Sequence, residues 1–237
     1  MGSEFIHVLM TRFNVRINWP HAFRGLDESW LKERFELFER YCLPSIKAQT
    51  CQDFHWLVFF DTATPHSFRQ RIAQYSGDLA CFVPCFVDFF DRTVFRDIVA
   101  SMELTRKRWI ITSRVDNDDA LARNCIERVQ AQFTGQEREF INLQNGLVLR
   151  RTRLYLGCDS SSHFPSLIEK STDPLTVYVN HMEMKNYAPV RQVGGEPGWL
   201  EVRHPGRLTE KGLCPSWKPV PMSRYVQLFP AISEFAT

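Results

Sequence analysis

The sequence lacks the features that would place it in a membrane, on a nucleic acid or in a repeat architecture. No apolar run approaches the roughly 18 residues that a membrane-spanning helix needs. The 29 basic and 27 acidic residues leave a net charge of +2, which is too small to indicate a nucleic-acid binder. There is no internal repeat and no low-complexity tract. We therefore expect a cytoplasmic globular protein whose association with a membrane is peripheral at most.

The cysteines also exclude two classes of protein. Seven cysteines are scattered along the chain, and the one close pair, Cys81 and Cys85, has no second pair at metal-ligand spacing. This excludes a disulfide framework and a structural zinc site, and favours free thiols in a reducing compartment. Residues 1–5, Met-Gly-Ser-Glu-Phe, resemble a vector-derived scar, so we expect the natural chain to begin near Ile6.

Length and composition indicate one domain. The chain has 237 residues, of which 44% are hydrophobic and 24% charged, as in an ordinary soluble globule. A chain of this size buries roughly 70 to 75% of its unfolded surface. We expect a single domain over residues 6–237, with a nucleotide-binding half at 6–133 and an acceptor-side half with a wrapping tail at 134–237.

The first half alternates apolar strands with amphipathic helices. Such alternation predicts an α/β fold with a mixed, mainly parallel sheet flanked by helices. We expect a first helix at residues 30–42, with Pro44 interrupting the helical pattern before a short second helix at 45–49. Further helices are expected at 68–75, 93–105 and 120–130. Strands are expected at 6–11, 55–60, 80–87 and 109–115.

The second half has a different pattern and predicts a smaller antiparallel extension. Residues 139–143 and 147–149 read as short strands, and Asn145-Gly146 between them is typical of a hairpin turn. Residues 164–170 are expected to open a helix. The tail from Pro189 to Pro221 has little periodicity, so we expect it to wrap the core or cover the site.

Three carboxylates follow one of the hydrophobic strands. Residues 109–115 run directly into Asp116, Asp118 and Asp119, at the strand end where open α/β sheets bind ligands. In an extended segment, Asp116 and Asp118 would share one side. Two carboxylates about 4 Å apart repel by about 4 kcal/mol at an effective dielectric near 20, so we expect a cation between them. Oxygen ligands favour Mg²⁺ or Mn²⁺, which commonly bind substrate phosphates too.

Two alternatives compete with this metal site. Asp119 precedes an expected helix and is a favoured N-cap residue, which would explain one of the three carboxylates. An EF-hand loop is the other alternative, because Asp116, Asp118 and Glu127 fit its first, third and twelfth positions. However, Leu121 stands where that loop requires glycine.

Several segments resemble known glycosyltransferases in both sequence and order. The resemblance to GT-A fold nucleotide-sugar glycosyltransferases lies in residues 45–50 (SIKAQT), 53–61 (DFHWLVFFD) and 114–119 (RVDNDD). More narrowly, the chain resembles the family named Putative rhamnosyl transferase in residues 11–16 (TRFNVR), 114–121 (RVDNDDAL) and 165–169 (PSLIE). The resemblance covers residues 6 to about 205 and implies a GT-A-like fold.

The resemblance also implies a donor site. Thr11 and Asn14 would line the nucleotide pocket, and Arg12 would contact the diphosphate. Asp61 would accept a hydrogen bond from the base, and Arg114 would hold charge on the sugar or the phosphate. The implied donor is a UDP- or dTDP-linked sugar.

The same resemblance assigns metal ligands. Asp116 would face the ribose or the metal, and Asp118 would bind Mn²⁺ or Mg²⁺ more directly and bridge it to the diphosphate. In the family, a C-terminal histidine completes the metal shell, and His204 is the matching residue here. A surface histidine in a polar loop is the alternative for His204.

The reaction implied is transfer of a sugar, with L-rhamnose as the candidate, to a glycan or glycolipid acceptor in polysaccharide biosynthesis. An inverting reaction needs a base for the acceptor hydroxyl. Glu169 is the leading candidate because it lies in the family-like segment 165–169, and Asp159 and Glu183 are rivals. His181 would stand at the acceptor cleft or in the core.

Two other functions fit parts of the sequence. A nucleotidyltransferase uses paired carboxylates, but it would need a glycine-rich phosphate loop after the first strand, and residues 12–16 contain no glycine. A non-catalytic glycan-binding module on the same fold is the second alternative. Trp199 and Trp217 would either stack on a sugar or anchor the tail.

Overall fold

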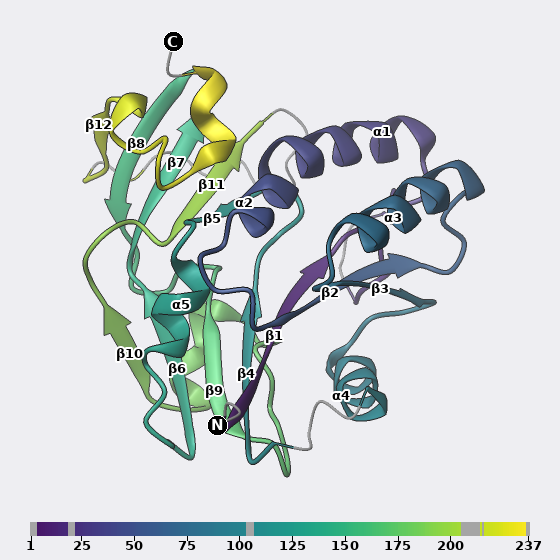
Figure 1. Ribbon diagram of the computed structural model, residues 1–237, viewed down its shortest axis with the longest axis horizontal. Helices are drawn as coiled ribbons and strands as arrows, with labels where there is room; N and C mark the ends of the chain where they lie inside the picture. Colours follow the sequence, from purple (N-terminus) through teal and green to yellow (C-terminus); the bar gives the residue numbers. More distant parts are fainter. Residues whose placement is uncertain (1–3, 19–21, 103–106, 205–213, 215, 236–237) are drawn as a thin grey trace.

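The computed structural model describes residues 4–18, 22–102, 107–204, 214 and 216–235, which form two sheets with helices packed against them (Figure 1). The larger sheet contains, in spatial order, β10 (Val190–Val193), β6 (Arg138–Leu143), β9 (Ser166–Lys170), β4 (Trp109–Arg114), β1 (Phe5–Arg12), β2 (His55–Asp61) and β3 (Phe82–Val87). The smaller sheet contains β12 (Lys218–Val220), β8 (Arg153–Cys158), β7 (Asn145–Arg150), β11 (Trp199–Arg203) and β5 (Ala120–Leu121).

The α-helices are α1 (Glu28–Leu37), α2 (Leu43–Lys47), α3 (His66–Asp78), α4 (Arg92–Ser101) and α5 (Cys125–Gln130). Short 3₁₀ helices span His181–Asn186, Met222–Arg224 and Pro230–Phe235. None of the helices in the described part of the chain is long and apolar enough to cross a membrane.

The predicted fold class is confirmed. Strands β4, β1, β2 and β3 are parallel neighbours, and β9 runs antiparallel to β4. The continuous apolar run of β2 packs on both faces of the sheet. Trp56 and Phe60 contact the core beneath α1 and α3, whereas Leu57 and Phe59 contact the core beneath α4. A central parallel strand is buried on both faces in this way.

Pro44 does not interrupt the first helical segment as predicted. Between α1 and α2 the chain forms a π-helical turn, Phe38–Cys42, and the amide of Leu43 bonds to the carbonyl of Phe38. Pro44 then lies in the first turn of α2, where a missing amide hydrogen costs little. The segment therefore continues to Lys47 without a break.

The helix expected over residues 120–130 begins late. Ala120 and Leu121 form β5, which pairs antiparallel with β11, and α5 begins only at Cys125. The side chain of Gln49 fixes this path, because it donates to the carbonyl of Ala122 and accepts the amide of Ile126. Asp119 therefore does not cap α5, and the capping alternative does not explain it.

The hairpin predicted at Asn145-Gly146 is wrong. Both residues lie inside β7, and Gln144 alone separates β7 from β6 in the other sheet. Gly146 is required for a different reason, since a Cβ there would lie 2.2 Å from the ring of Trp199. The hairpin joins β7 to β8 instead, and Arg151 at its turn has a φ of 56°.

The helix expected at residues 164–170 is also wrong, because Ser166–Lys170 is β9, between β4 and β6. Leu167 and Ile168 pack into the cores on opposite faces of the sheet, as successive strand residues do. The tail expected to be irregular likewise supplies β10, β11 and β12.

Candidate functional site

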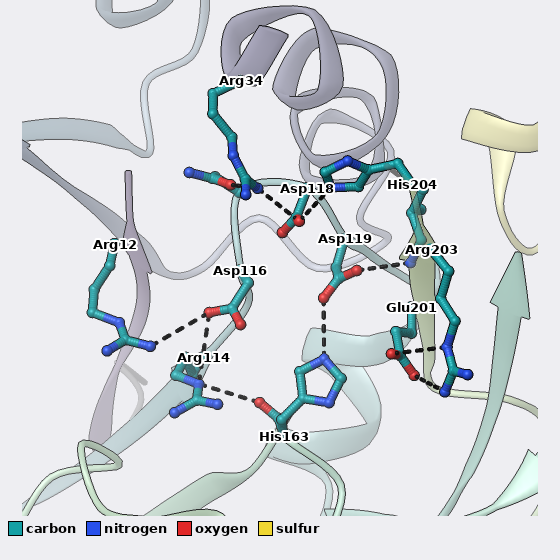
Figure 2. Close-up of polar contacts among 12 residues, drawn as sticks. Arg12, Arg34, Arg114, Asp116, Asp118, Asp119, His163, Glu201, Arg203 and His204 are labelled. Atoms are coloured by element: carbon teal, nitrogen blue, oxygen red, sulfur yellow. Dashed lines mark hydrogen bonds and ion pairs between the residues drawn. The ribbon is translucent and has the colours of Figure 1, made fainter. Parts of the chain in front are cut away.

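The parallel strands β1, β2 and β4 end at one edge of the larger sheet, and their terminal residues carry charge. Arg12 ends β1, Asp61 ends β2 and Arg114 ends β4. Asp116, Asp118 and Asp119 follow β4 at the same edge (Figure 2). The predicted position of the site at the carboxyl ends of the strands is therefore matched by the geometry.

The three aspartates lie on a turn and not on an extended segment as predicted. The amide of Asp119 donates to the carbonyl of Asp116 at 3.2 Å. Asn117 fixes the turn, because its side-chain amide donates to the carbonyl of Phe13 at 2.9 Å. Asn and Asp favour turns of this kind. The turn separates Asp118 from Asp116 and brings Asp119 towards Asp116.

Asp118 is paired with two side chains from distant parts of the sequence. Its Oδ2 accepts a hydrogen bond of 2.7 Å from Nη1 of Arg34, on α1, and lies 3.0 Å from Nε2 of His204. Figure 2 shows Asp118 between these two partners. The structure therefore brings Asp118 and His204 together, as the resemblance implied, but a buried arginine shares the same carboxylate oxygen.

Asp119 is held by β11 and by a loop histidine. Its Oδ1 accepts the amide of Val202 at 2.8 Å, and its Oδ2 lies 3.1 Å from Nε2 of His163. Hydrogen bonding to Asp119 and the charge of Asp116 outweigh the lowering effect of burial and raise the pKa of His163. His163 was not predicted as a site residue, although it lies in the polar segment just before residues 165–169.

Asp116 is the accessible member of the group. Its side chain is 33% exposed, against 11% for Asp118 and 1% for Asp119. Nη2 of Arg12 and Nε of Arg114 each lie 3.9 Å from its Oδ1. Burial alone would raise the pKa of Asp116, but Arg114 and Arg12 outweigh it and hold this pKa below its usual range. The edge therefore presents an ionised carboxylate between two guanidinium groups.

Arg12 has further capacity for hydrogen bonding. Its Nε is buried without a hydrogen-bond partner, and its guanidinium carbon lies 5.4 Å from the ring centre of Tyr178. An anion bound beside Asp116 would give this group an acceptor.

The arginines change the electrostatic argument for a metal. Arg34 neutralises Asp118, while Arg12 and Arg114 flank Asp116. These guanidinium groups supply counter-charge to Asp118 and Asp116, so the mutual repulsion of the carboxylates does not by itself require a cation. A metal site must be judged from the convergence of its ligand atoms.

One set of side chains in the described residues converges in this way. Asp116, Asp119 and His163 each offer a ligand atom, and these atoms lie within 4.8 Å of one another. Carboxylate oxygen with imidazole nitrogen suits Mn²⁺, and small side-chain rotations would bring the atoms to the roughly 2.1 Å ligand distance of a small divalent ion. The set shares Asp116 with the predicted ligands and contains Asp119 and His163 where the prediction has Asp118 and His204.

Asp61 and Asn14 lie at the same edge with partners inside the chain. Oδ2 of Asp61 lies 3.0 Å from Nε of Arg16, and its Oδ1 accepts the amide of Ala63. The side chain of Asn14 accepts the amide of Asp61 and donates to the hydroxyl of Thr64. Asn14 and Asp61 therefore connect the loop after β1 to the loop after β2. These loops shape the edge where the nucleobase of a donor would bind.

Thr11 does not line this edge. Its side chain is fully buried, and its hydroxyl accepts the indole hydrogen of Trp56 at 2.9 Å. It faces the core one residue before the strand ends, where alternation along β1 turns its side chain away from that of Arg12. We therefore correct its expected role from the nucleotide pocket to the core.

Glu169 is placed far from the carboxylates. It pairs with Ile110 in the antiparallel register of β9 and β4, and the six residues from there to Asp116 span roughly 20 Å. Its oxygens accept hydrogen bonds from Arg138 and from the amides of Leu175 and Thr176. Burial raises the pKa of Glu169. The expected role as base is corrected to a structural one.

The two rivals for the base lie in other segments of the chain. The carboxylate of Asp159 accepts the amide of Ser161 in the loop that carries His163. Glu183 is exposed on a 3₁₀ helix, and the ring of His181 lies 6.1 Å from that of His163.

Of the two tryptophans expected in the tail, Trp199 anchors it. Trp199 is buried in β11, donates its indole hydrogen to the carbonyl of Leu143 and stacks on Phe164 at 4.9 Å. The ring of Trp217 lies 6.0 Å from that of Trp199. Neither observation assigns a sugar-stacking role.

Comparison with known families identifies the family of the chain. The family model described as "Putative rhamnosyl transferase" matches residues 23–209, which is most of the chain. The chain belongs to this family. The description of the family places its members among the glycosyltransferases. A comparison with curated proteins finds no match.

Solved structures give the fold. The chain is similar to TarS of S. aureus with a TM-score of 0.52 and 11% identity, over 85% of this chain and 37% of TarS. Against TarS 1-349 in complex with UDP-GlcNAc, the TM-score is 0.51 at 11% identity, over 86% of this chain and 60% of the other. The chain thus spans less than two thirds of either structure. At this identity the likeness establishes the fold and nothing further.

The structural role of Glu169 is testable. Glu169→Ala leaves two amide hydrogens and Arg138 without their acceptor, so we expect the free energy of unfolding to fall by about 3 kcal/mol. Urea denaturation monitored by circular dichroism measures this change. Glu137→Ala, which removes an exposed ion pair with Lys170, is the control and should leave stability unchanged. Normal stability of Glu169→Ala with loss of turnover would instead favour the catalytic role.

Proposed function

We propose that the protein is a glycosyltransferase that takes its sugar from a nucleotide-diphosphate donor, UDP- or dTDP-linked, and passes it to a glycan or glycolipid acceptor. The observation that carries this proposal is the convergence of Arg12, Arg114 and the accessible Asp116 at the carboxyl ends of parallel strands. Family membership and the fold support it. L-rhamnose is the proposed sugar, on the family's description alone.

The charge pattern suits the chemistry of the leaving group. Sugar transfer breaks the bond between the anomeric carbon and the diphosphate, so negative charge grows on the departing oxygen. Arg12 and Arg114 would supply fixed positive charge to stabilise that oxygen. The buried Nε of Arg12, which has no partner in the described structure, would donate to a phosphate oxygen.

We propose that Mn²⁺ or Mg²⁺ binds to Asp116, Asp119 and His163. Such an ion supplies Lewis acidity to a diphosphate leaving group. Asp119 is positioned for this by the amide of Val202, which fixes its other oxygen. In this proposal Asp118 and His204 support the site, because Arg34 already supplies the counter-charge of Asp118.

For an inverting reaction Asp159 is the proposed base. It lies in the loop that carries His163, and its side chain is partly exposed. Glu169 is too far from the carboxylate edge to take this role. Turnover measured with Asp159→Asn would assess the assignment.

The two alternative functions have less support. A nucleotidyltransferase would need a glycine-rich phosphate loop, and residues 12–16 after β1 contain no glycine. A non-catalytic glycan-binding module would not need an accessible carboxylate between two arginines at the strand ends. Turnover of a nucleotide sugar separates both from the proposal.

The catalytic proposal predicts the behaviour of Arg12. With a panel of UDP- and dTDP-sugars and Mn²⁺, we expect release of the nucleoside diphosphate, and Arg12→Ala should lower kcat about 100-fold because leaving-group charge is less stabilised. Arg16→Ala, on the adjacent loop, is the control with a smaller expected effect. Transfer that persists in EDTA would contradict metal dependence, and failure of every donor would contradict the transferase.

The metal proposal predicts different effects for two histidines. His163→Ala should weaken Mn²⁺ binding, measured by electron paramagnetic resonance in the presence of UDP, at least about tenfold because one ligand is lost. His204→Ala removes a histidine that contacts Asp118 and should change the Mn²⁺ affinity less. The reverse order would assign the metal to the originally predicted ligands, Asp118 and His204.

A further inference from the structure

A cavity of about 830 Å³ opens at the end of the smaller sheet that lies away from Asp119. Its wall includes Asn145 at the start of β7, Cys158 at the end of β8 and the loop 195–197 before β11. Asp119 contacts β11 at Val202, five residues beyond this loop, which is roughly 17 Å along the strand. The cavity is therefore distinct from the donor site.

The wall of this cavity is basic. Arg123, Lys218 and Arg224 line it from three separate segments of the chain. All three side chains are exposed, and no ion pair within the described residues engages any of them. Among the described residues of the wall, Glu196 is the one acidic residue, and its Oε2 accepts a hydrogen bond from Nδ2 of Asn124 at 3.4 Å. Three unpaired cations facing one cavity favour an anionic ligand.

A second observation indicates a hydroxyl-bearing ligand. Oδ1 of Asn124 is buried and has no hydrogen-bond partner in the described part of the chain, although Asn124 lines the cavity. A buried acceptor without a donor costs free energy, and a ligand hydroxyl would remove that cost. Tyr225 in the same wall offers an aromatic ring, with the guanidinium carbon of Arg224 5.5 Å from its centre.

The rim of the cavity is held in place before any ligand arrives. Arg128 donates to the carbonyls of Gly194 and Glu196, and Asn145 donates to the carbonyl of Gly195 at 2.6 Å. A rim fixed by side-chain hydrogen bonds loses little conformational entropy on binding.

We propose that this cavity binds an anionic carbohydrate, with the cations taking a carboxylate or phosphate group and Asn124 taking a sugar hydroxyl. A role for the cavity in holding a remote part of the acceptor glycan rests on the proposed transferase function. Binding itself does not depend on that function, since the cavity and the donor site share no wall residue.

Isothermal titration calorimetry on the full chain, without nucleotide or metal, tests the proposal. The probes are tetragalacturonate, glucose 1-phosphate, inorganic phosphate and the neutral maltotetraose. We expect one of the two charged sugars to bind at least about tenfold more tightly than maltotetraose, with an affinity that falls as salt is added. Comparison of the carboxylate with the phosphate sugar identifies the preferred anion.

Charge reversal locates the binding. Lys218→Glu combined with Arg224→Glu should weaken the affinity for the charged sugar at least about tenfold. Arg92→Glu, on the exposed first turn of α4 at the far side of the larger sheet, is the matched control and should leave the affinity unchanged. The double variant should keep the far-ultraviolet circular dichroism spectrum and the unfolding midpoint of the unaltered chain, which shows that it is folded.

Three results would overturn the proposal. The first is that neither charged sugar binds. The second is that the double variant binds the charged sugar as tightly as the unaltered chain does. The third is that Arg92→Glu loses as much affinity as the double variant. If inorganic phosphate binds as tightly as the better-bound charged sugar, the proposal of a carbohydrate ligand is overturned and the cavity is an anion site only. Each result is independent of whether the chain transfers a sugar.

Discussion

Neutralisation of three aspartates within four residues is the constraint on which the rest of the structure depends. The turn after β4 concentrates negative charge at a buried edge, and charges of this kind are tolerated only with partners. Arg34 comes from α1, His204 and the amide of Val202 come from β11 or its end, and His163 comes from a loop. The turn therefore ties the N-terminal helix and the smaller sheet to the larger sheet.

The same constraint determines which of the three aspartates remains available for function. Asp118 and Asp119 use their oxygens within the protein, whereas Asp116 is partly exposed and lies 3.9 Å from both Arg12 and Arg114. A site whose supporting residues are fixed by hydrogen bonds holds its reactive groups in one geometry. The buried pairs thus hold in place an edge at which one carboxylate and two guanidinium groups lie close together.

Much of the larger sheet could be predicted because its strands carry a local signal. The apolar runs of β2 and β4 and the carboxylates after them indicated parallel strands and a site at their ends. The smaller sheet was harder, because its pairing depends on contacts distant in sequence. Asn145-Gly146 has the composition of a hairpin turn, but Gly146 is needed for the approach of Trp199.

Within the site, residue types were predicted better than residue partners. The aspartates, Arg12, Arg114 and His204 were identified from the sequence, and the structure gathers them at one edge. The extended geometry assumed for Asp116 and Asp118 was wrong, because the hydrogen bond between Asp119 and Asp116 closes a turn. His163 was missed because a histidine in a polar loop carries no periodic signal. Glu169 was misassigned because the family-like segment 165–169 indicates a residue type but does not fix its distance from the site.

The central claim is that this turn makes Asp116 and Asp119, with His163, the residues that hold a divalent cation beside the donor diphosphate. Anomalous diffraction at the manganese edge, from crystals soaked with Mn²⁺ and UDP, tests it most directly. The account predicts one strong peak in contact with Asp116, Asp119 and His163. A peak bound by Asp118 and His204 instead, or no peak with UDP clearly present, would contradict it.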